Sequence, residues 1–562
     1  MANDEYRTSP DHENTGWPPG VPYIVGNEGC ERFSFYGMKA ILFVHLASLY
    51  VLAGYVEEQA KDVATSTTHL FIAGVYAFPM IGAILADRLL GKYKTILWLS
   101  LVYCAGHGVL AVGENSLTGM YLGLALIAIG SGGIKPCVSA NVGDQFGRSN
   151  WFRVRTIFQI FYFSINFGSA FATIIIPRTR EYLGTSVAFA IPGILMGIAT
   201  VVFWLGRKKF VHVPPKPGGK LGLLDALSSI FLFMALGQLF FTSSMAWWVI
   251  VLVGAASFAI GLVLFVVRQK LQPDDGFLAI MLTTLWDHIS GKKAAQSSAV
   301  GANGSNVGVP SVEEPKEPDE VVKAPLARYA FWRPAVARFG QEATEGPVAV
   351  LKIISIFFLV SVFWALFDQH SSSWIRQAEM MDRTFTLPLI GEMTLLPSEL
   401  PALNPFMVMA LIPLMNVLYN LSDKLGFAPT PLRRMTVGML LTSASFVAVA
   451  LIQTSIVANG EGTVAVAWQV LPYLIITASE VMVSITGLEF AYTQAPKRMK
   501  STILGFWMLT VSVGNILVAV IAHIPELSLV SFFWLFAGLM AVAGLGFGAR
   551  AYFYTPKDYP QD

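Results

Sequence analysis

Charged side chains interrupt the first long apolar segment of the chain. Glu28, Glu31, Arg32 and Lys39 all lie within residues 21–52, which are otherwise mainly apolar. On a helix these four positions share one face. A charge near the centre of a bilayer costs about 2.5–3.5 kcal/mol on insertion scales. We therefore expect this face to line a wet cavity, where two carboxylates and two cations bind a charged ligand or exchange protons.

A simpler explanation covers part of this pattern. Glu28 and Arg32 are spaced i,i+4, so they can form a self-neutralising pair that only holds helices together. That pair leaves Glu31 and Lys39 without a purpose, and we favour a functional role for the face as a whole.

The composition excludes an ordinary soluble protein. Of the 562 residues, 54% are hydrophobic and 13% are charged, whereas soluble domains have about 25% charged residues. The mean hydropathy of +0.58 also indicates a membrane protein. A net charge of +2 gives no indication of nucleic-acid binding, and we expect no nucleic-acid partner. The polar segment 1–19 has the features of neither a signal peptide nor a transit peptide.

Fourteen apolar stretches have roughly the 20 residues that a helix needs to cross a bilayer. We predict an all-α membrane protein with six spans in each half and two extra helices between the halves. The spans are placed at about 21–52, 66–87, 94–113, 118–141, 156–177, 186–206, 221–242, 246–268, 350–370, 403–422, 433–456, 466–492, 501–523 and 527–550.

The predicted domain organisation follows from these spans and from a change of composition. Residues 290–325 are rich in charged, small and Pro residues and indicate a flexible loop. Residues 326–339 are expected at the membrane surface. The parts are a cytoplasmic tail (1–19), a six-helix bundle (20–206), two inserted helices (207–270), a cytoplasmic loop (271–345), a second six-helix bundle (346–551) and a cytoplasmic tail (552–562).

Lys and Arg are unevenly distributed between the two sets of short loops. One set contains many, including Arg88, Lys92, Arg433 and Arg434, and the other contains few. Because cytoplasmic loops carry the excess of Lys and Arg, we expect both termini inside, at a cell (plasma or inner) membrane.

A similar turn follows the second span of each half. Asp87 and Arg88 precede Gly91 in the first, and Asp423 and Lys424 precede Gly426 in the second. Positive-inside anchoring accounts for either turn alone. Recurrence at the same place in both halves favours duplication, and the turn resembles that of the major facilitator superfamily.

Several further motifs resemble those of the proton-coupled oligopeptide transporter (POT) family of that superfamily. The first is Glu28-Gly29-Cys30-Glu31-Arg32-Phe33-Ser34-Phe35-Tyr36-Gly37, which is similar to the ExxERFxYYG signature with Phe35 at the first Tyr position. The others are Gly130-Ser131-Gly132-Gly133-Ile134-Lys135-Pro136, Phe161 to Gly168, Phe363 to Gln369 and Thr486 to Pro496. With His69, the last two are similar to mammalian members, whereas the extra helix pair is typical of bacterial ones.

This resemblance implies a proton-coupled symporter that imports di- and tripeptides by alternating access. Lys39 stands where bacterial members often have Arg. The resemblance implies that cations bind the peptide carboxylate, that Glu480 binds its amine, that Asn166 binds its backbone and that aromatic residues line side-chain pockets. The substrate-binding residues are then Arg32, Tyr36, Lys39, Tyr76, Lys135, Tyr162, Asn166, Trp364, Glu480 and Trp507.

Structural explanations exist for some of these residues. Lys135 can instead form an ion pair with Glu28 or Glu31, and both roles can hold in different states. Asn166 can form a hydrogen bond between helices. An isolated charge in an apolar span such as Glu480 is better explained by function.

Coupling requires groups that gain and lose a proton during the cycle. Carboxylates respond to burial and to neighbouring cations, which makes Glu28, Glu31 and Asp368 candidates. His69 titrates near neutrality, although it can also be a neutral helix-bonding residue. For gating we single out Asp87, Arg88 and Lys352, the last as an ion-pair partner of Asp368. We expect no cofactor and no metal, with a proton gradient as the energy source.

Other functions are compatible with parts of this pattern. A carrier of the same fold for nitrate, an amino-acid derivative or another small zwitterion is the main alternative, and a receptor without transport is another. The chain has no HExxH, GxSxG or GxxxxGK[ST] motif, which argues against a membrane enzyme. The expected partners are peptides, protons and the lipid bilayer. The sequence does not predict an oligomeric state.

Overall fold

A computed structural model describes residues 6–237, 246–272, 276–289, 325–387, 391–494, 500–524 and 527–555. Within them, thirteen helical stretches are long and apolar enough to cross a membrane. They match thirteen of the fourteen predicted spans. The described part of the remaining one, 221–242, is the helix Gly219–Gly237, and residues 238–242 lie outside the described residues.

The first half contains six long helices, as predicted. They are α1 (Val21–Leu52), α2 (Glu57–Ile84), α3 (Lys92–Val112), α4 (Leu117–Gly143), α5 (Val154–Leu183) and α6 (Thr185–Leu205), with short helical turns η1 (Leu85–Leu90), η2 (Arg148–Arg153) and η3 (Gly206–Lys208) between them. In this half α1 packs against α5 and α6, and α4 packs against α2 and α3.

The second half also contains six spans, three of which are built from more than one helical piece. Its elements are α11 (Arg333–Phe367), η6 (Asp368–Ser371), α12 (Ser373–Glu379), η7 (Pro397–Ala402), α13 (Leu403–Lys424), α14 (Pro431–Asn459), η8 (Val466–Gln469), α15 (Val470–Glu480), η9 (Val481–Ile485), α16 (Thr486–Thr493), α17 (Lys500–Ile521) and α18 (Leu529–Tyr552). A small antiparallel hairpin of β1 (Thr384–Leu387) and β2 (Gly391–Thr394) lies between α12 and η7.

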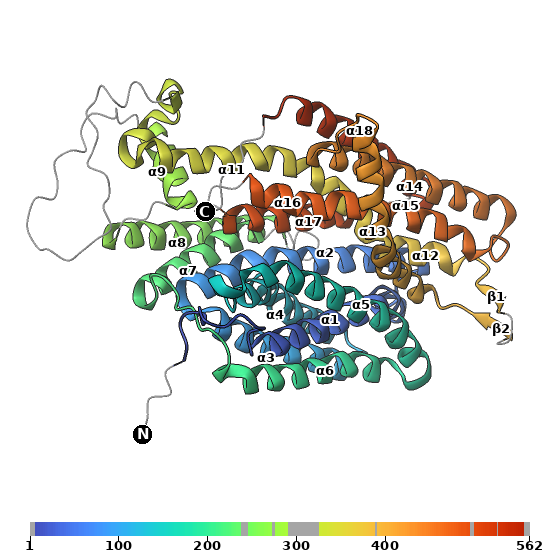
Figure 1. Cartoon of the computed structure of the whole chain (residues 1–562). Coiled ribbons are helices and arrows are strands. Elements are labelled where there is room, and N and C mark those ends of the chain that lie inside the picture. The colour runs from blue at the N-terminus through green and yellow to red at the C-terminus, as the bar shows by residue number, and fades with distance from the viewer. Residues whose placement is uncertain are drawn as a thin grey trace, which may run out of the picture.

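The two halves lie against each other as two layers (Figure 1). The interface is made by α2 against α17 and by α5 against α13 and η7. The hairpin β1–β2 lies at one end of the bundle, and the turn η1 lies at the other end, beside the inserted helices. The η1 turn contains Arg88, one of the cations that predict a cytoplasmic loop. The end with the hairpin β1–β2 therefore corresponds to the outer side in the predicted orientation.

Both predicted tight turns after the second spans are present. Gly91 and Gly426 adopt φ values of +80° and +82°, a region that residues with a Cβ rarely occupy. The first turn, η1, is a π-helical segment that contains Asp87 and Arg88. The repeated glycine therefore has a backbone reason in both halves.

The inserted helices α7 (Gly219–Gly237) and α8 (Trp247–Leu271) form a hairpin that is attached to this first turn. Asp225 of α7 forms ion pairs with Arg88, at 3.6 Å between Oδ2 and Nη1, and with Arg268 of α8, at 2.8 Å between Oδ1 and Nε. The backbone N–H of Lys216 donates to the Asp87 carbonyl oxygen. Figure 1 shows helices α7 and α8 in green at one end of the first half. The hairpin is thus bound to the first half through the Asp87–Arg88 turn.

The segment 271–345 differs from the predicted loop. It contains a further helix, α9 (Phe277–Ile289), and the short turn η5 (Pro325–Arg328). Helix α11 already begins at Arg333 and bends at Gly340, where φ is +83°. Of the residues 290–325, which were expected to form a flexible loop, all but Pro325 lie outside the described residues.

The close contact of α7 with the η1 turn generates a prediction. A Cβ at Gly222 would lie 1.9 Å from the carbonyl oxygen of Arg88, so Gly222→Ala must push the hairpin away from the turn. We expect a lower Tm in detergent, with a cost of about 1–3 kcal/mol, which is typical of overpacking.

Gly197→Ala in α6 is the matched control, because a Cβ there meets no atom of the described residues within 4 Å. Alanine favours a helix over glycine by about 0.5–1 kcal/mol, so this variant should keep or raise the Tm. An unchanged Tm for Gly222→Ala would show that the hairpin is not held at this contact.

Candidate functional site

The run Gly130-Ser131-Gly132-Gly133 brings α4 into close contact with its neighbours. A Cβ on Gly132 would lie 2.5 Å from the Val75 carbonyl oxygen of α2, and one on Gly130 would lie 2.7 Å from the Tyr103 backbone nitrogen of α3. Helix packing therefore explains these glycines. The packing leaves Ser131 facing α1, where its hydroxyl donates to Glu31 Oε1 at 2.6 Å.

The charged face of α1 forms one compact cluster. Arg32 Nε lies 2.7 Å from Glu28 Oε1 and 3.2 Å from Glu31 Oε2. Lys135 Nζ approaches Glu31 Oε1 at 3.9 Å from α4. The self-neutralising pair of Glu28 and Arg32 is thus present, but it is part of a larger group in which Glu31 is shared between two cations.

Lys135 keeps unused binding capacity. Its side chain is 7% exposed, and its ammonium group makes no hydrogen bond to any described residue. It lies over the Phe35 ring at 4.1 Å and near the Tyr76 ring at 5.3 Å, both measured to the ring centroid. A buried ammonium group normally uses its donors. Lys135 is therefore the cation of the cluster best placed to bind an added carboxylate.

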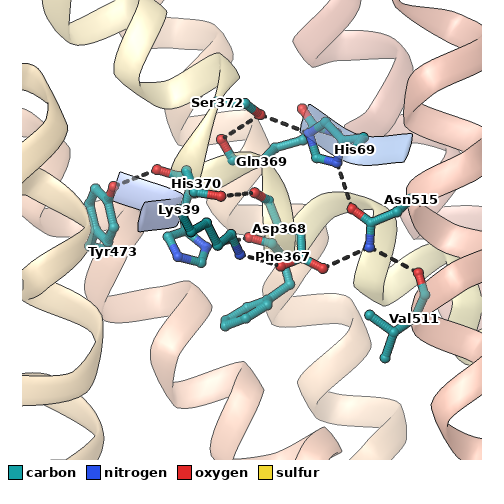
Figure 2. Close-up of polar contacts among 11 residues, drawn as sticks. Lys39, His69, Phe367, Asp368, Gln369, His370, Ser372, Tyr473, Val511 and Asn515 are labelled. Carbon is teal, nitrogen blue, oxygen red and sulfur yellow. Dashed lines mark hydrogen bonds and ion pairs between the residues drawn. The ribbon is translucent and has the colours of Figure 1, made fainter. Parts of the chain in front are cut away.

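A buried ion pair joins the two halves at the centre of the interface. Lys39 Nζ of α1 lies 2.9 Å from Asp368 Oδ1, and both side chains are 6% exposed. Asn515 of α17 donates to the other Asp368 oxygen at 2.8 Å (Figure 2). The predicted pairing of Asp368 with Lys352 is wrong for this structure. Lys352 is exposed and lies 16 residues earlier on α11, which is about 24 Å along the helix.

His69 is linked to the same carboxylate through Asn515. Nδ2 of Asn515 lies 2.9 Å from the Val511 carbonyl oxygen and also contacts the Asp368 carboxylate. The carbonyl and the carboxylate can only accept hydrogen bonds, so Asn515 is the donor to both, through Nδ2. Its Oδ1 therefore faces His69, and Nδ1 of His69 donates to it at 2.6 Å. Nε2 is then the basic nitrogen of the imidazole, and it accepts from the Ser372 hydroxyl at 2.7 Å. Figure 2 shows this chain from Ser372 to Lys39.

Glu480 lies where a regular helix gives way to a π-helical turn. Helix α15 ends at Glu480, and η9 follows it directly. Such widened turns occur frequently at functional sites. Asn404 of α13 donates to Glu480 Oε2 at 2.7 Å. Across the interface, Glu480 interacts electrostatically with Tyr36 and Tyr162 of the first half.

The remaining predicted binding residues have mixed surroundings. Asn166 donates to the Tyr162 carbonyl oxygen of its own helix at 2.9 Å, so the alternative bond between helices does not form here. Trp507 is 2% exposed and packs on Phe357 and against Gly487, within the second half. Trp364 is buried beside it, with ring centroids 6.3 Å apart. In this conformation both tryptophans belong to the core.

Ion pairs at the outer end were missed by the sequence analysis. Arg178 of α5 binds Glu399 of η7 with two hydrogen bonds, at 2.5 and 2.9 Å. Arg376 of α12 binds Asp62 of α2 at 2.7 Å and also contacts Glu58. All of these pairs join the first half to the second. In the sequence, Arg178 and Arg376 are recognisable only as members of the loop set with few Lys and Arg residues. Nothing in the sequence indicated their carboxylate partners.

Comparison with known proteins decides the family. The sequence profile of the POT family matches residues 93–222 and 226–535. The chain belongs to the POT family. A solved auto-inhibited POT family peptide transporter is 35% identical, with a TM-score of 0.73, over 97% of this chain and 99% of that one. The POT family transporter PepTSo is 37% identical, with a TM-score of 0.73, over 96% and 98%.

Animal relatives in the POT family carry names that refer to peptides or to solute transport. Solute carrier family 15 member 2 of Mus musculus is 25% identical over 98% of this chain and 92% of its own length. The Homo sapiens protein of the same name is 30% identical over 80% of this chain. Peptide transporter family 1 of Drosophila melanogaster is 31% identical over 76%. The matches cover 51% of the human protein and 47% of the fly protein.

The central ion pair generates a second prediction. Removing one partner of a buried pair leaves an uncompensated charge and costs about 3–5 kcal/mol. Lys39→Met and Asp368→Asn should therefore each lower the Tm in detergent, whereas the double variant has no unpaired charge and should lose less than the sum. Strictly additive losses in this cycle would contradict a direct pair.

Proposed function

We propose that the protein is a proton-coupled symporter that imports di- and tripeptides by alternating access. The single observation that supports the substrate class is that a cation and a carboxylate lie on opposite sides of the interface. A buried cation with unused donors, Lys135, lies in the first half, and a carboxylate, Glu480, lies in the second. A short peptide is a zwitterion with one charge at each end, and this arrangement matches it.

The carboxylate end would bind to the cluster on α1 and α4. Arg32 offers a forked donor, and Lys135 offers a compact ammonium group that makes no hydrogen bond to a described residue. Both are held in place by Glu31, which they share. A peptide carboxylate would satisfy the buried ammonium group and loosen its hold on Glu31.

The amine end would bind to Glu480. One of its oxygens is occupied by Asn404, which orients the carboxylate. Tyr36 and Tyr162 of the opposite half lie within electrostatic range of it. A peptide held at both ends would therefore touch both halves, which is how a substrate can bias their relative movement.

Proton coupling is assigned to two groups of side chains. Glu28 and Glu31 share cations that a peptide competes for, and Asp368 and His69 belong to the chain that links the halves. Because these groups interact, they titrate together, and the proton cannot be assigned to a single residue. One charge that crosses 100 mV provides about 2.3 kcal/mol, which supports roughly 40-fold accumulation of a substrate.

The ion pairs that cross the interface fit one state of such a cycle. Arg178 with Glu399, Arg376 with Asp62, and Lys39 with Asp368 all join the two halves. Alternating access would require these contacts to break when the site opens outward. We further propose a plasma or inner membrane location with both termini in the cytoplasm, in agreement with the distribution of Lys and Arg.

The main alternative is a carrier for another small zwitterion or anion. A solved transporter of the same fold, 20% identical, is described in complex with 5-aminolevulinic acid. The experiment that separates the two is uptake of labelled dialanine into proteoliposomes, with and without an acid-outside gradient, in competition with di- and tripeptides, nitrate and 5-aminolevulinic acid. Stronger competition by nitrate or aminolevulinate than by peptides would reject the proposal.

Glu480→Gln tests the amine site. The amide cannot neutralise an ammonium group, so uptake of dialanine should fall by at least about 10²-fold, the effect of losing a buried hydrogen-bonded charge pair of about 3 kcal/mol. An N-acetylated dipeptide, which has no charged amine, should lose no affinity in a thermal-shift assay. Wild-type uptake by this variant would remove Glu480 from the site.

Glu31→Gln tests the coupling role. The amide still accepts a hydrogen bond from Ser131, but it cannot take up or release a proton. Gradient-driven accumulation of dialanine should fall to the level of equilibration, whereas exchange of labelled for unlabelled peptide should continue. Accumulation at the wild-type level would contradict the assignment.

A further inference from the structure

A small pocket lies at the outer end of the interface between the halves. It is lined by Asp62 and Thr65 of α2, by Ser373 and Arg376 of α12, and by apolar side chains such as Ile521 and Phe532. It has room for one water molecule. We call it the outer pocket.

Ser373 indicates that the outer pocket is wet. Its side chain is 2% exposed, and its hydroxyl has no hydrogen-bond partner among the described residues. A buried hydroxyl without a partner is costly, and ordered water is the usual partner in such a place. The hydroxyl lines the pocket, so a water molecule there would satisfy it.

Two residues that line the outer pocket, Thr65 and Ser373, are close along the chain to His69 and to its partner Ser372. Thr65 lies four residues before His69 on α2, so both occupy the same face of the helix. Ser373 directly follows Ser372, whose hydroxyl bonds Nε2 of His69 at 2.7 Å. The other ring nitrogen is committed to Asn515. The nitrogen that can accept a proton is therefore the one bonded to Ser372, the sequence neighbour of the pocket-lining Ser373.

From this placement, which rests on the proposed function, we propose that the outer pocket is the path by which an external proton reaches His69. Asp62 takes up the proton at the outer mouth and passes it to water in the pocket. The Ser372 hydroxyl then accepts a proton from that water as it gives its own to Nε2. One proton moves, no electrons are transferred, and His69 becomes an imidazolium.

The charges around this path allow each end to titrate. Asp62 faces Arg376 at 2.7 Å and interacts electrostatically with His523 at the end of α17. Arg376 also contacts Glu58, so it keeps a counter-charge when Asp62 is protonated. Asp62 lines the pocket and Glu58 does not, so Asp62 is the carboxylate that serves the pocket.

His69 has its own set of charged neighbours. It interacts with Asp368, Lys39 and His370, which come from both halves. An imidazolium here would compete with Lys39 for Asp368 through Asn515. A proton that arrives by the outer pocket would therefore weaken the central contact between the halves.

The test is dialanine uptake at several external pH values, in proteoliposomes with the membrane potential clamped. Asp62→Asn should reduce gradient-driven uptake by about 10²-fold, as expected for a lost proton-transfer group. Peptide exchange without a gradient should remain, and Asp62→Glu should restore the driven uptake. Ser373→Ala removes a hydroxyl that no described residue uses, and it should act in the same direction without lowering the Tm.

Glu58→Gln is the matched control, since Glu58 contacts the same arginine but does not line the pocket. Its effect should stay below about fivefold, as for one exposed ion pair. Wild-type pH profiles for both Asp62→Asn and Ser373→Ala, or an equal loss in Glu58→Gln, would overturn the proposal. A wild-type protein that ignores the proton gradient would instead overturn the proposed function.

Discussion

The buried contact between Lys39 and Asp368 is the constraint on which the rest of the site depends. It is the only pairing in Figure 2 that joins a cation and a carboxylate, and it joins α1 to the end of α11 across the interface. Two charges in an apolar interior are tolerated only together. Anything that changes the charge on one partner therefore changes the preferred distance between the halves. A proton and a charged substrate are both able to do this, which is why binding and movement can be coupled here.

Close packing within the first half prepares the other cluster. The glycines at 130 and 132 bring α4 against α2 and α3, and this contact directs Ser131 and Lys135 toward Glu31. The cluster on α1 is thus rigid before any substrate arrives, and little ordering is left to be done on binding. Glu480 is positioned differently, by a change of helix geometry and by one amide from α13.

Much of this architecture could be predicted from the sequence, because apolar length and the spacing of charges are local properties. The six-plus-six organisation and the charged face of α1 are of this kind. Contacts between distant segments are not. Lys39 and Asp368 are 329 residues apart, and the nearest apparent cation on the same helix, Lys352, is exposed. The outer ion pairs, the link through Asn515 and the π-helical turns depend on how helices meet, and composition carries no record of that.

The attachment of α7 and α8 to the Asp87–Arg88 turn has a mechanical consequence. The hairpin is tied by Asp225 and by the close approach of Gly222 to a single half. When the halves tilt against each other, these contacts would carry the hairpin along with the first half. The end of the hairpin that lies farthest from the interface would then move farther through the surrounding lipid than the helices at the interface do. The local thickness and stiffness of the bilayer would thereby add a load to every turnover.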